Sequence, residues 1–490
     1  MVQIPDEFLN RKQKLQQLKE LGINPYPAQA QRTIKIANFL ESFDDFLETK
    51  DKQTITGRLK LKRGHGKLTF GHLEDESGKL QIVFSQKDIG EERYDFMKNF
   101  CDVGDILELT GTAFLTLKKE KSFLVTQVKI LTKALRPLPE KWKGLIDEEA
   151  RYRKRYLDLL MNPELRQMFI VKSRFWSSIR SFLLQEGFLE VETPVLEVTP
   201  GGADAEPFVT HHNALDIDVY LRISMGELWQ KRLMVAGFEK TFEIGRQFRN
   251  EGISPEHLQD YTQMEFYWAY ADYKKGMALV ERMYKKCIQE TFNTLKFTIG
   301  KFNVDLEQPW PQLDYGTEIK KQLKIDIFSD NDDALRKKCD ALGLNSKKII
   351  SRSKLIDALW KQCRKNIAGP AFLTGHPVAV SPLAKRSVVD QNKVERFQII
   401  IAGSELGNGY SELNDAADQA ERFSQQTRLR KAGDKEAQMP DDDFVEALEY
   451  GMPPTCGFGV SERLFSFLMN KSIRECVLFP LLRPKSSTKK

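Results

Sequence analysis

The stretch of residues 242–267 (FEIGRQFRNEGISPEHLQDYTQMEFY) holds the side chains best suited to chemistry. Arg249 carries a planar fork of donors that suits a phosphate, and Glu251 can accept a hydrogen bond from an amino group. His257 and Tyr261 suit a phosphate tail and the face of a base. These four side chains indicate a site for a ligand with a phosphate and a base, and the alternative is a surface hairpin with a mixed-charge tip.

The flanking segments indicate how these side chains are positioned. Residues 241–248 and 262–268 alternate between apolar and polar side chains, which is typical of β-strands, and an Arg-Asn-Glu-Gly turn follows the first segment. The pattern predicts a long hairpin that carries its polar residues into a site.

Length and composition limit the class of protein. The 490 residues predict two or three domains, and 41% hydrophobic with 29% charged residues is ordinary for a globular protein. The sequence has no apolar run long enough for a membrane span and no secretory signal, so we expect no membrane association and a cytoplasmic location. Six scattered cysteines without a C-x-x-C pair predict neither a zinc site nor a disulfide framework.

Residues 51–136 form the first predicted domain. Five short strand-like runs separated by turn residues indicate a small closed barrel of the OB type, which binds single-stranded nucleic acid on basic and aromatic side chains. Phe70 is the candidate stacking platform and Gln81 the candidate reader of a base edge. Lys62 and Arg63, in a basic run, are candidate phosphate contacts. The alternative for Phe70 is an ordinary residue of the barrel core.

The other segments complete the predicted domain organisation. Residues 1–50 are expected to form a helical extension, and residues 137–165 a hinge that begins with two prolines. A larger domain follows over residues 166–484, and residues 485–490 form a polar tail that we expect to be disordered.

Together these segments resemble the class II aminoacyl-tRNA synthetases, and most closely the bacterial type of class II lysyl-tRNA synthetase. GFLEVETPVL resembles the first motif of that family, FRNEG…EF the second, and the glycine-rich stretch that ends at Arg463 the third. TKALRPLPEKW, SPLAKR, ELGNGYSELND and ALEYGMPPT are more specific matches. The resemblance covers residues 20–483.

The resemblance implies an α+β chain, with an OB-fold anticodon-binding domain followed by a catalytic domain built on an antiparallel sheet flanked by helices. It implies a homodimer formed largely through the first motif. It also implies a lysine–tRNA ligase, which activates lysine with ATP and transfers it to the terminal adenosine of lysine tRNA. Neither step needs a protein nucleophile, so positioning and charge stabilisation must supply catalysis.

Site residues follow from the same resemblance. Arg249 and Arg463 are the expected catalytic residues, on either side of the triphosphate, and Glu251, His257, Tyr261 and Glu405 complete the ATP site. Magnesium is expected at Glu405, with Gln398 and Glu412 as further ligands. A lysine substrate has two ammonium groups that need carboxylate partners when buried. The expected lysine-binding residues are Gly202, Glu227, Glu265, Tyr267, Asn408 and Glu412.

The chain departs from the family pattern at three places. One extra residue precedes Glu227, Gln398 stands where the family has a magnesium-binding glutamate, and the segment ending at Arg463 is one residue shorter. Two alternatives therefore remain at this stage. One is a synthetase of the aspartyl or asparaginyl type, and the other is a relative that has lost catalysis.

Overall fold

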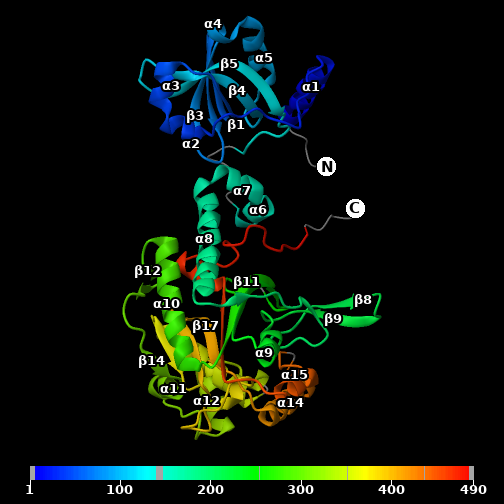
Figure 1. Cartoon of the computed structure of the whole chain (residues 1–490), viewed down its shortest axis with the longest axis vertical. Coiled ribbons are helices and arrows are strands. Elements are labelled where there is room, and N and C mark those ends of the chain that lie inside the picture. Colours follow the sequence, from blue (N-terminus) through cyan, green and yellow to red (C-terminus); the bar gives the residue numbers. More distant parts are fainter. Residues whose placement is uncertain (1–5, 140–146, 253, 350, 435, 485–490) are drawn as a thin grey trace. The chain divides into compact units, whose positions relative to one another are not determined.

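The structure is a computed structural model that describes residues 6–139, 147–252, 254–349, 351–434 and 436–484. The chain divides into two compact units, Met1–Met161 and Asn162–Lys490 (Figure 1). The predicted tail at 485–490 and part of the predicted hinge, residues 140–146, lie outside the described residues. None of the described helices is long and apolar enough to cross a membrane.

The first unit is built on the predicted five-stranded barrel. The strands close in the order β1-β2-β3-β5-β4, and Ile55, Leu73, Ile82 and Phe123 fill the interior. The elements of this unit are α1 (Asp6–Glu20), α2 (Ile36–Glu41), α3 (Phe43–Thr49), β1 (Gln53–His65), β2 (Leu68–Glu74), β3 (Lys79–Ser85), α4 (Gln86–Ile89), α5 (Glu91–Phe100), β4 (Ile106–Leu115), β5 (Lys121–Thr132), α6 (Glu148–Arg153) and α7 (Arg155–Met161).

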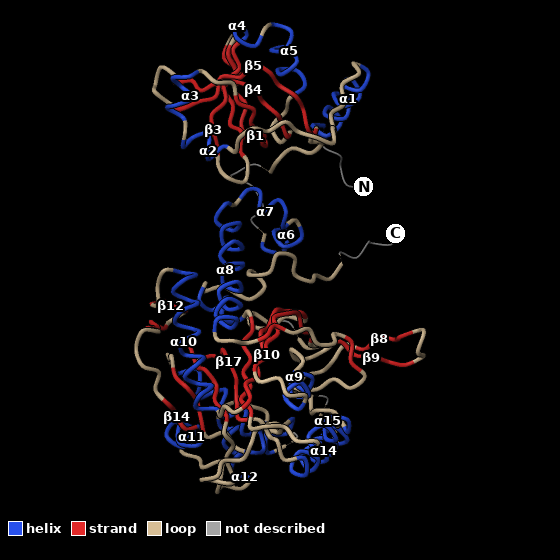
Figure 2. Tube along the Cα trace, viewed as in Figure 1, coloured by secondary structure: helices blue, strands red, loops and turns tan. Residues whose placement is uncertain are grey.

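The second unit is built on an eight-stranded sheet with the order β14-β15-β16-β17-β18-β11-β10-β6 (Figure 2). The sheet is antiparallel apart from its two outermost pairings, β14 with β15 and β6 with β10, which are parallel. Its strands are β6 (Leu189–Glu190), β10 (Lys240–Phe248), β11 (Asp260–Ala269), β14 (Gln312–Asp314), β15 (Ala371–Thr374), β16 (Arg396–Ile401), β17 (Ser404–Ser411) and β18 (Thr455–Ser461). The predicted α+β class is confirmed.

Helices cover both faces of this sheet. On one face Tyr284 of α10 packs against Phe458 of β18, and α10 lies beside α8 (Figure 1). On the other face Leu228 of α9 packs with Tyr267 of β11. The helices of the unit are α8 (Pro163–Gln185), α9 (Glu227–Val235), α10 (Tyr273–Phe292), α11 (Tyr315–Leu323), α12 (Asp332–Ala341), α13 (Arg352–Cys363), α14 (Ala416–Lys431), α15 (Asp442–Glu449) and α16 (Arg463–Leu468).

Smaller elements complete the unit. Short β-structure is formed by β7 (Leu196–Glu197), β8 (Val209–His212) and β9 (Ile217–Leu221) in one three-stranded sheet, and by β12 (Lys296–Ile299) and β13 (Phe302–Asp305) in a hairpin. The 3₁₀ turns are η1 (Ser346–Lys348), η2 (Arg364–Asn366) and η3 (Val378–Val380). Strands β6, at the sheet edge, and β7 have only two residues each and lie on either side of Pro194, which has no N–H for a ladder.

The predicted hairpin is the pair β10 and β11. The two strands pair antiparallel from Lys240 opposite Trp268 to Phe248 opposite Asp260. Because side chains alternate between the faces of a strand, Tyr261, Gln263, Glu265 and Tyr267 share one face of β11. The hairpin therefore places a row of polar side chains on the face that also carries α9.

Candidate functional site

A cavity of about 550 Å³ opens on this polar face of the sheet. All thirteen residues that the sequence predicts for the ATP, lysine and metal sites line it, although they come from segments far apart in the chain. They are Gly202, Glu227, Arg249, Glu251, His257, Tyr261, Glu265, Tyr267, Gln398, Glu405, Asn408, Glu412 and Arg463. The predicted candidates therefore meet at one place.

One end of the cavity holds the residues predicted for the nucleotide. The backbone N–H of Arg249 donates to Gln259 O (2.8 Å), which fixes the turn after β10, and its guanidinium lies 5.9 Å from the centre of the Tyr261 ring. Arg249 Nε is buried and has no hydrogen-bond partner among the described residues. Burial also raises the pKa of Glu251, and Arg249 opposes that shift. An unpartnered guanidinium donor beside an aromatic ring suits a phosphate joined to a base.

Arg463 begins α16, directly after β18, and faces the same end of the cavity. Its Nη2 donates to Ser404 Oγ (2.7 Å) and to the carboxylate of Glu256. Its Nε, like that of Arg249, is buried and unpartnered in the part of the chain that the structure describes. His257 lies on the same loop as Glu256, and its Nδ1 is 2.7 Å from Ser254 Oγ. Burial, followed by the charge of Arg463, lowers the pKa of His257.

The other end of the cavity is rich in buried carboxylates. Glu265 accepts from Met225 N (3.0 Å), Gln263 Nε2 (2.6 Å) and Tyr267 Oη (3.1 Å). Burial, and then the charge of Glu227, raises the pKa of Glu265 to about 7. A cation that enters beside such a buried carboxyl favours its ionised form and forms an ion pair with it.

Lys231, which the sequence analysis did not single out, lies between two of the predicted carboxylates. Its Nζ is 2.7 Å from Glu227 Oε1 and 2.5 Å from Glu412 Oε2. The Tyr410 hydroxyl also donates to Glu227. Burial alone would lower the pKa of Lys231, but the two carboxylates raise it overall. Burial raises the pKa of Glu412 well above its usual range despite Lys231, and Glu412 Oε1 accepts no hydrogen bond from any described residue.

Glycines allow the backbone to approach these carboxylates closely. A Cβ on Gly457 would lie 2.1 Å from Glu412 Oε1, and a Cβ on Gly202, whose φ is +86°, would lie 2.5 Å from Glu227 Cβ. Gly226, the extra residue before Glu227, adopts φ +68° at the start of α9, and a Cβ there would lie 2.0 Å from Thr193 Oγ1. Gly226 thus adopts a left-handed conformation that accommodates the extra residue, and Glu227 still lines the cavity.

The geometry ranks the predicted metal ligands. Gln398 Oε1 faces His376 Nε2 (3.0 Å), while Gln398 Nε2 donates to Glu405 Oε2 (3.2 Å). Burial lowers the pKa of His376 to about 3, so its ring is neutral and its Nε2–H donates to Gln398. Since Glu412 is paired with Lys231, the geometry favours Glu405 over Gln398 and Glu412. Among the described residues, no three His, Cys, Asp or Glu side chains form a preassembled metal cluster.

Asn408 lies on β17 between these two ends, and Arg396 Nε donates to its Oδ1 (2.8 Å). A further wall of the cavity comes from α13. Trp360 Nε1 donates to Glu405 Oε1 (2.7 Å), and Arg364 and Lys361 also line the cavity. Sequence spacing gave no signal for α13, whereas Lys231 could have been found because it is one helical turn after Glu227.

The predicted nucleic-acid residues lie on β1, β2 and β3 of the barrel. Phe70 is half-buried and pairs with Arg63 and Val83, on the outward side of a strand whose Thr69 and Gly71 point inward. Arg63 is exposed, and Gln81 Nε2 donates to Ser122 Oγ (2.9 Å). Lys62 Nζ donates to the carbonyls of Met97, Lys98 and Cys101 at the end of α5. Lys62 thus caps a helix here, while Phe70 and Arg63 remain on the outer surface.

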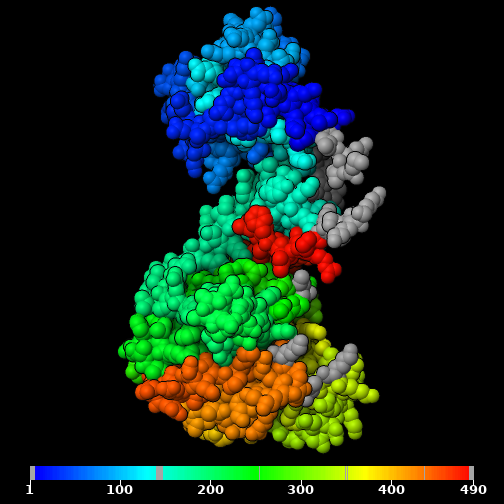
Figure 3. Space-filling view, turned by 90° about the vertical axis from the view of Figure 1, so that its right-hand side faces the viewer, coloured from blue at the N-terminus to red at the C-terminus, as the bar shows by residue number. Residues whose placement is uncertain are grey.

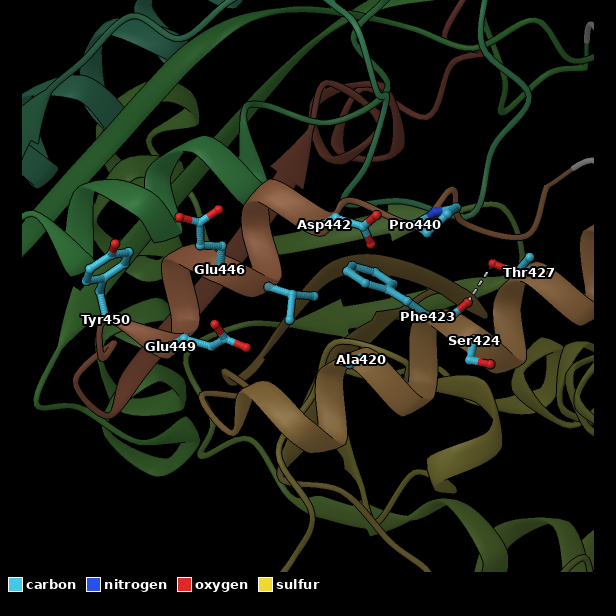
Figure 4. A pocket seen from close by; sticks show the side chains of 10 residues that line it. Ala420, Phe423, Ser424, Thr427, Pro440, Asp442, Glu446, Glu449 and Tyr450 are labelled. Atoms are coloured by element: carbon cyan, nitrogen blue, oxygen red, sulfur yellow. Dashed lines mark hydrogen bonds between the residues drawn. The ribbon is translucent and has the colours of Figure 1, made fainter.

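A second pocket, of about 650 Å³, lies between α14 and α15 (Figure 4). Its lining includes Phe423 and Thr427 of α14, Glu446 and Glu449 of α15, and Tyr450, which follows α15. These two helices form a continuous part of the surface of the second unit, drawn in orange in Figure 3. None of the predicted site residues lines this pocket, so the cavity on the polar face of the sheet is the candidate for chemistry.

Comparisons with known proteins agree with this geometry. Residues 147–483 match the family of class II tRNA synthetases (D, K and N), and residues 53–131 match the OB-fold nucleic acid binding domain. A lysine–tRNA ligase of Carboxydothermus hydrogenoformans is 43% identical, with 97% of each chain covered. That of Thermotoga maritima is 42% identical over 97% of this chain and 95% of its own. The heat-inducible lysine–tRNA ligase of Escherichia coli K12 is 42% identical over 98% and 97%.

Proposed function

The chain belongs to the class II lysine–tRNA ligases, and on that basis we propose that its cavity binds lysine and ATP side by side and joins them as lysyl-adenylate. The observation that carries the proposal is the division of one cavity into an arginine end and a carboxylate end. The arginine end suits the phosphates of ATP, and the carboxylate end suits the two ammonium groups of lysine.

The direction of bound lysine follows from the order of side chains along β11. Tyr261 lies nearest the turn that carries Arg249, and Glu265 and then Tyr267 follow on the same face. Tyr267 is opposite Gly457, the glycine that makes room for Glu412. We therefore place the carboxylate of lysine toward Arg249, its α-ammonium at Glu265 and its ε-ammonium at Glu412, the most buried of the three acids.

The charges of the pocket support this orientation. Glu227, Glu265 and Glu412 provide three carboxyl groups, and Lys231 pairs with Glu227 and Glu412. The two ammonium groups of a lysine substrate would lower the raised pKa of Glu265 and of Glu412, so that both carboxyls ionise beside them. A neutral side chain in the same place would leave a buried carboxylate unpaired, which is the basis for its rejection. An aspartate substrate would add a carboxylate here, so the aspartyl or asparaginyl alternative is disfavoured.

Catalysis in this arrangement comes from positioned charge. The lysine carboxylate attacks the α-phosphate of ATP and pyrophosphate leaves, while Arg249 and Arg463 stabilise the charge that develops on the phosphates. A ribose hydroxyl of the tRNA then attacks the adenylate carbonyl and AMP leaves. Mg²⁺ would enter with ATP and bind Glu405, because this ion commonly uses one or two carboxylates plus phosphates. It would neutralise phosphate charge there.

Lysine-dependent exchange of pyrophosphate into ATP tests the proposal. We expect exchange with lysine and Mg²⁺ present, and far less when norleucine, which lacks the ε-ammonium, replaces lysine. Exchange that responds to aspartate or asparagine, or to no amino acid, would contradict the assignment of the pocket.

Lysine affinity is expected to depend on pH through Glu265. The pKa of Glu265 is raised to about 7, so a large fraction of this carboxyl is protonated below that pH and cannot pair with the α-ammonium. The Kd for lysine should therefore fall as pH rises from about 6 to about 8, and binding should release a proton near neutrality. Titration calorimetry in buffers of different ionisation enthalpy measures both effects. Glu265→Gln should reduce the proton release, and an unchanged Kd across this range in the wild type would exclude Glu265 from this role.

The barrel is proposed to bind the anticodon through Phe70 and Arg63. Replacing Phe70 with alanine should weaken charging of lysine tRNA by about tenfold, the value of one stacked base, with pyrophosphate exchange nearly unchanged. Steady-state aminoacylation and exchange assays on the same preparation separate the two effects. Phe123→Ala, inside the barrel, is the contrast that should destabilise the fold. Equal losses in both assays for Phe70→Ala would mean that this ring only supports the barrel.

We also propose a homodimer formed through the segment around Pro194. Five apolar side chains there are 42–67% exposed, namely Leu184, Leu189, Val195, Leu196 and Val198, and β6 is a two-residue edge strand. Such a patch beside an open edge is typical of an interface. Sedimentation should show a dimer, and Leu196→Glu should shift it to a monomer. A wild-type monomer at micromolar concentration would contradict the proposal.

A further inference from the structure

Glu256 brings a negative charge into the end of the cavity that is proposed to hold phosphates. Its Oε2 accepts from Arg463 Nη2 and from Ser404 Oγ (3.0 Å), and Arg463 Nη2 also donates to Ser404 Oγ (2.7 Å). The three side chains come from the loop between β10 and β11, the start of β17 and the start of α16. The carboxylate of Glu256 is thus paired with Arg463, the arginine that is proposed to contact the triphosphate.

The loop that carries Glu256 is held over the cavity by a second contact. The backbone N–H of Ile473 donates to Pro255 O (2.9 Å), and Ser254 and His257 close the turn on either side of Glu256. Burial acts to raise the pKa of Glu256, but Arg463 and the hydrogen bonds from Ser404 and Arg463 lower it overall. The carboxyl is therefore ionised at neutral pH, and its contact with Arg463 is charge-assisted.

We propose that Glu256 is an internal competitor for the phosphates of ATP, which neutralises Arg463 in the nucleotide-free chain and is displaced when ATP binds. This inference rests on the proposed nucleotide site. In this role Glu256 weakens nucleotide binding and does not contribute to it. The strength of its contact with Arg463 determines how much ATP is needed before Arg463 binds phosphate.

The charges at this end explain why ATP can displace the carboxylate. Arg249, Lys361, Arg364 and Arg463 all line the cavity, and Glu256 makes an ion pair with Arg463 among them. A triphosphate carries several charges and can contact several of these cations at once, whereas Glu256 offers one. The side chain of Glu256 is 38% exposed, so a change of rotamer is enough to move it into solvent.

The contact also connects the nucleotide to the loop. While Glu256 holds Arg463, the hairpin tip is joined to β17 and α16 through Ser404. Displacement by ATP would release this connection and leave Ser404, which precedes the proposed magnesium ligand Glu405, bonded to Arg463 alone. Binding of ATP and rearrangement of the hairpin tip are therefore expected to occur together.

The test is ATP affinity in the full chain with Glu256→Gln, which keeps the shape of the side chain and removes its charge. Calorimetric titration with Mg²⁺ and ATP should give a Kd about fivefold lower than in the wild type, as for the loss of one partly exposed ion pair. In pyrophosphate exchange the KM for ATP should fall similarly, while the KM for lysine stays the same. The difference in Kd should shrink at high salt, because the competing contact is electrostatic.

Asp260→Asn is the matched control. Asp260 lies on the same hairpin and pairs with Arg246, but neither residue lines the cavity, so the same loss of charge should leave the Kd for ATP unchanged. Glu256→Asp, one methylene shorter, is a second variant that keeps the charge and should give a Kd between those of wild type and Glu256→Gln.

Two outcomes separate this inference from the proposed function. If Glu256→Gln binds ATP as the wild type does, or more weakly, the competitor role is overturned while the nucleotide site stands. If the wild-type chain binds no ATP, the assignment of the cavity itself is overturned, and Glu256 has no nucleotide to compete with.

Discussion

Replacing Arg249 with alanine is expected to lower the rate of lysine-dependent pyrophosphate exchange by about 10²- to 10³-fold, the usual effect of removing a donor aimed at charge that develops in a transition state. Arg249 Nε is buried and has no partner among the described residues, so a donor is available for a ligand. Because the negative charge on the phosphates grows during the attack, most of the loss should appear in kcat, with a smaller rise in the KM for ATP.

Arg246→Ala is the matched control for this experiment. Arg246 lies on β10, three residues before Arg249, is partly exposed and pairs with Asp260, and it does not line the cavity. It also lies 3.8 Å from Glu462, which keeps its contact with Lys172. Loss of Arg246 should change exchange by less than about threefold, as expected for a partly exposed ion pair. Equal losses in the two variants would mean that Arg249 acts through the stability of the hairpin. No loss in Arg249→Ala would remove it from the catalytic residues.

The hairpin shows how much of this site local sequence can predict. Alternation of apolar and polar residues predicts β10 and β11 to within two residues at each end, and that register alone places Tyr261, Glu265 and Tyr267 on one face. The same period indicates the five strands of the barrel. The resemblance to a family then supplied the remaining segments of the cavity, which no spacing rule connects.

Contacts between distant segments explain why the sequence did not predict the roles of Trp360, Lys62 and Glu256. Trp360 and Glu405 are 45 residues apart, and only the packing of α13 on the sheet brings them together. The basic run around Lys62 predicted a phosphate contact. In the structure the Lys62 ammonium donates hydrogen bonds to backbone carbonyls at the end of α5. Glu256 lies inside the stretch quoted first, yet its importance depends on Arg463, 207 residues later.

Glu412 offers the sharpest test of specificity, because it combines full burial with an unused acceptor. Only 1% of the residue is exposed, its Oε2 contacts Lys231, and its Oε1 has no hydrogen bond within the described chain. Glu412→Gln preserves the volume of the side chain and removes the carboxylate that would form beside the ε-ammonium of bound lysine. Lys231 keeps its pairing with Glu227 at 2.7 Å, so the variant retains a partner for the buried ammonium and is expected to fold.

In Glu412→Gln the kcat/KM for lysine should fall by roughly 10²- to 10³-fold, since a buried ε-ammonium loses its counter-charge. The loss should appear in the KM for lysine, with the KM for ATP nearly unchanged. Glu449→Gln on α15, an exposed residue with the same change of charge, is the control and should behave as wild type.

Norleucine, which lacks the ε-ammonium, gives the decisive comparison for Glu412. In the wild type norleucine leaves the acid at position 412 without a cationic partner, whereas the neutral amide of Glu412→Gln needs none. The ratio of lysine to norleucine in pyrophosphate exchange should therefore drop in Glu412→Gln. An unchanged ratio would show that the ε-ammonium lies elsewhere, with Glu227 as the next candidate.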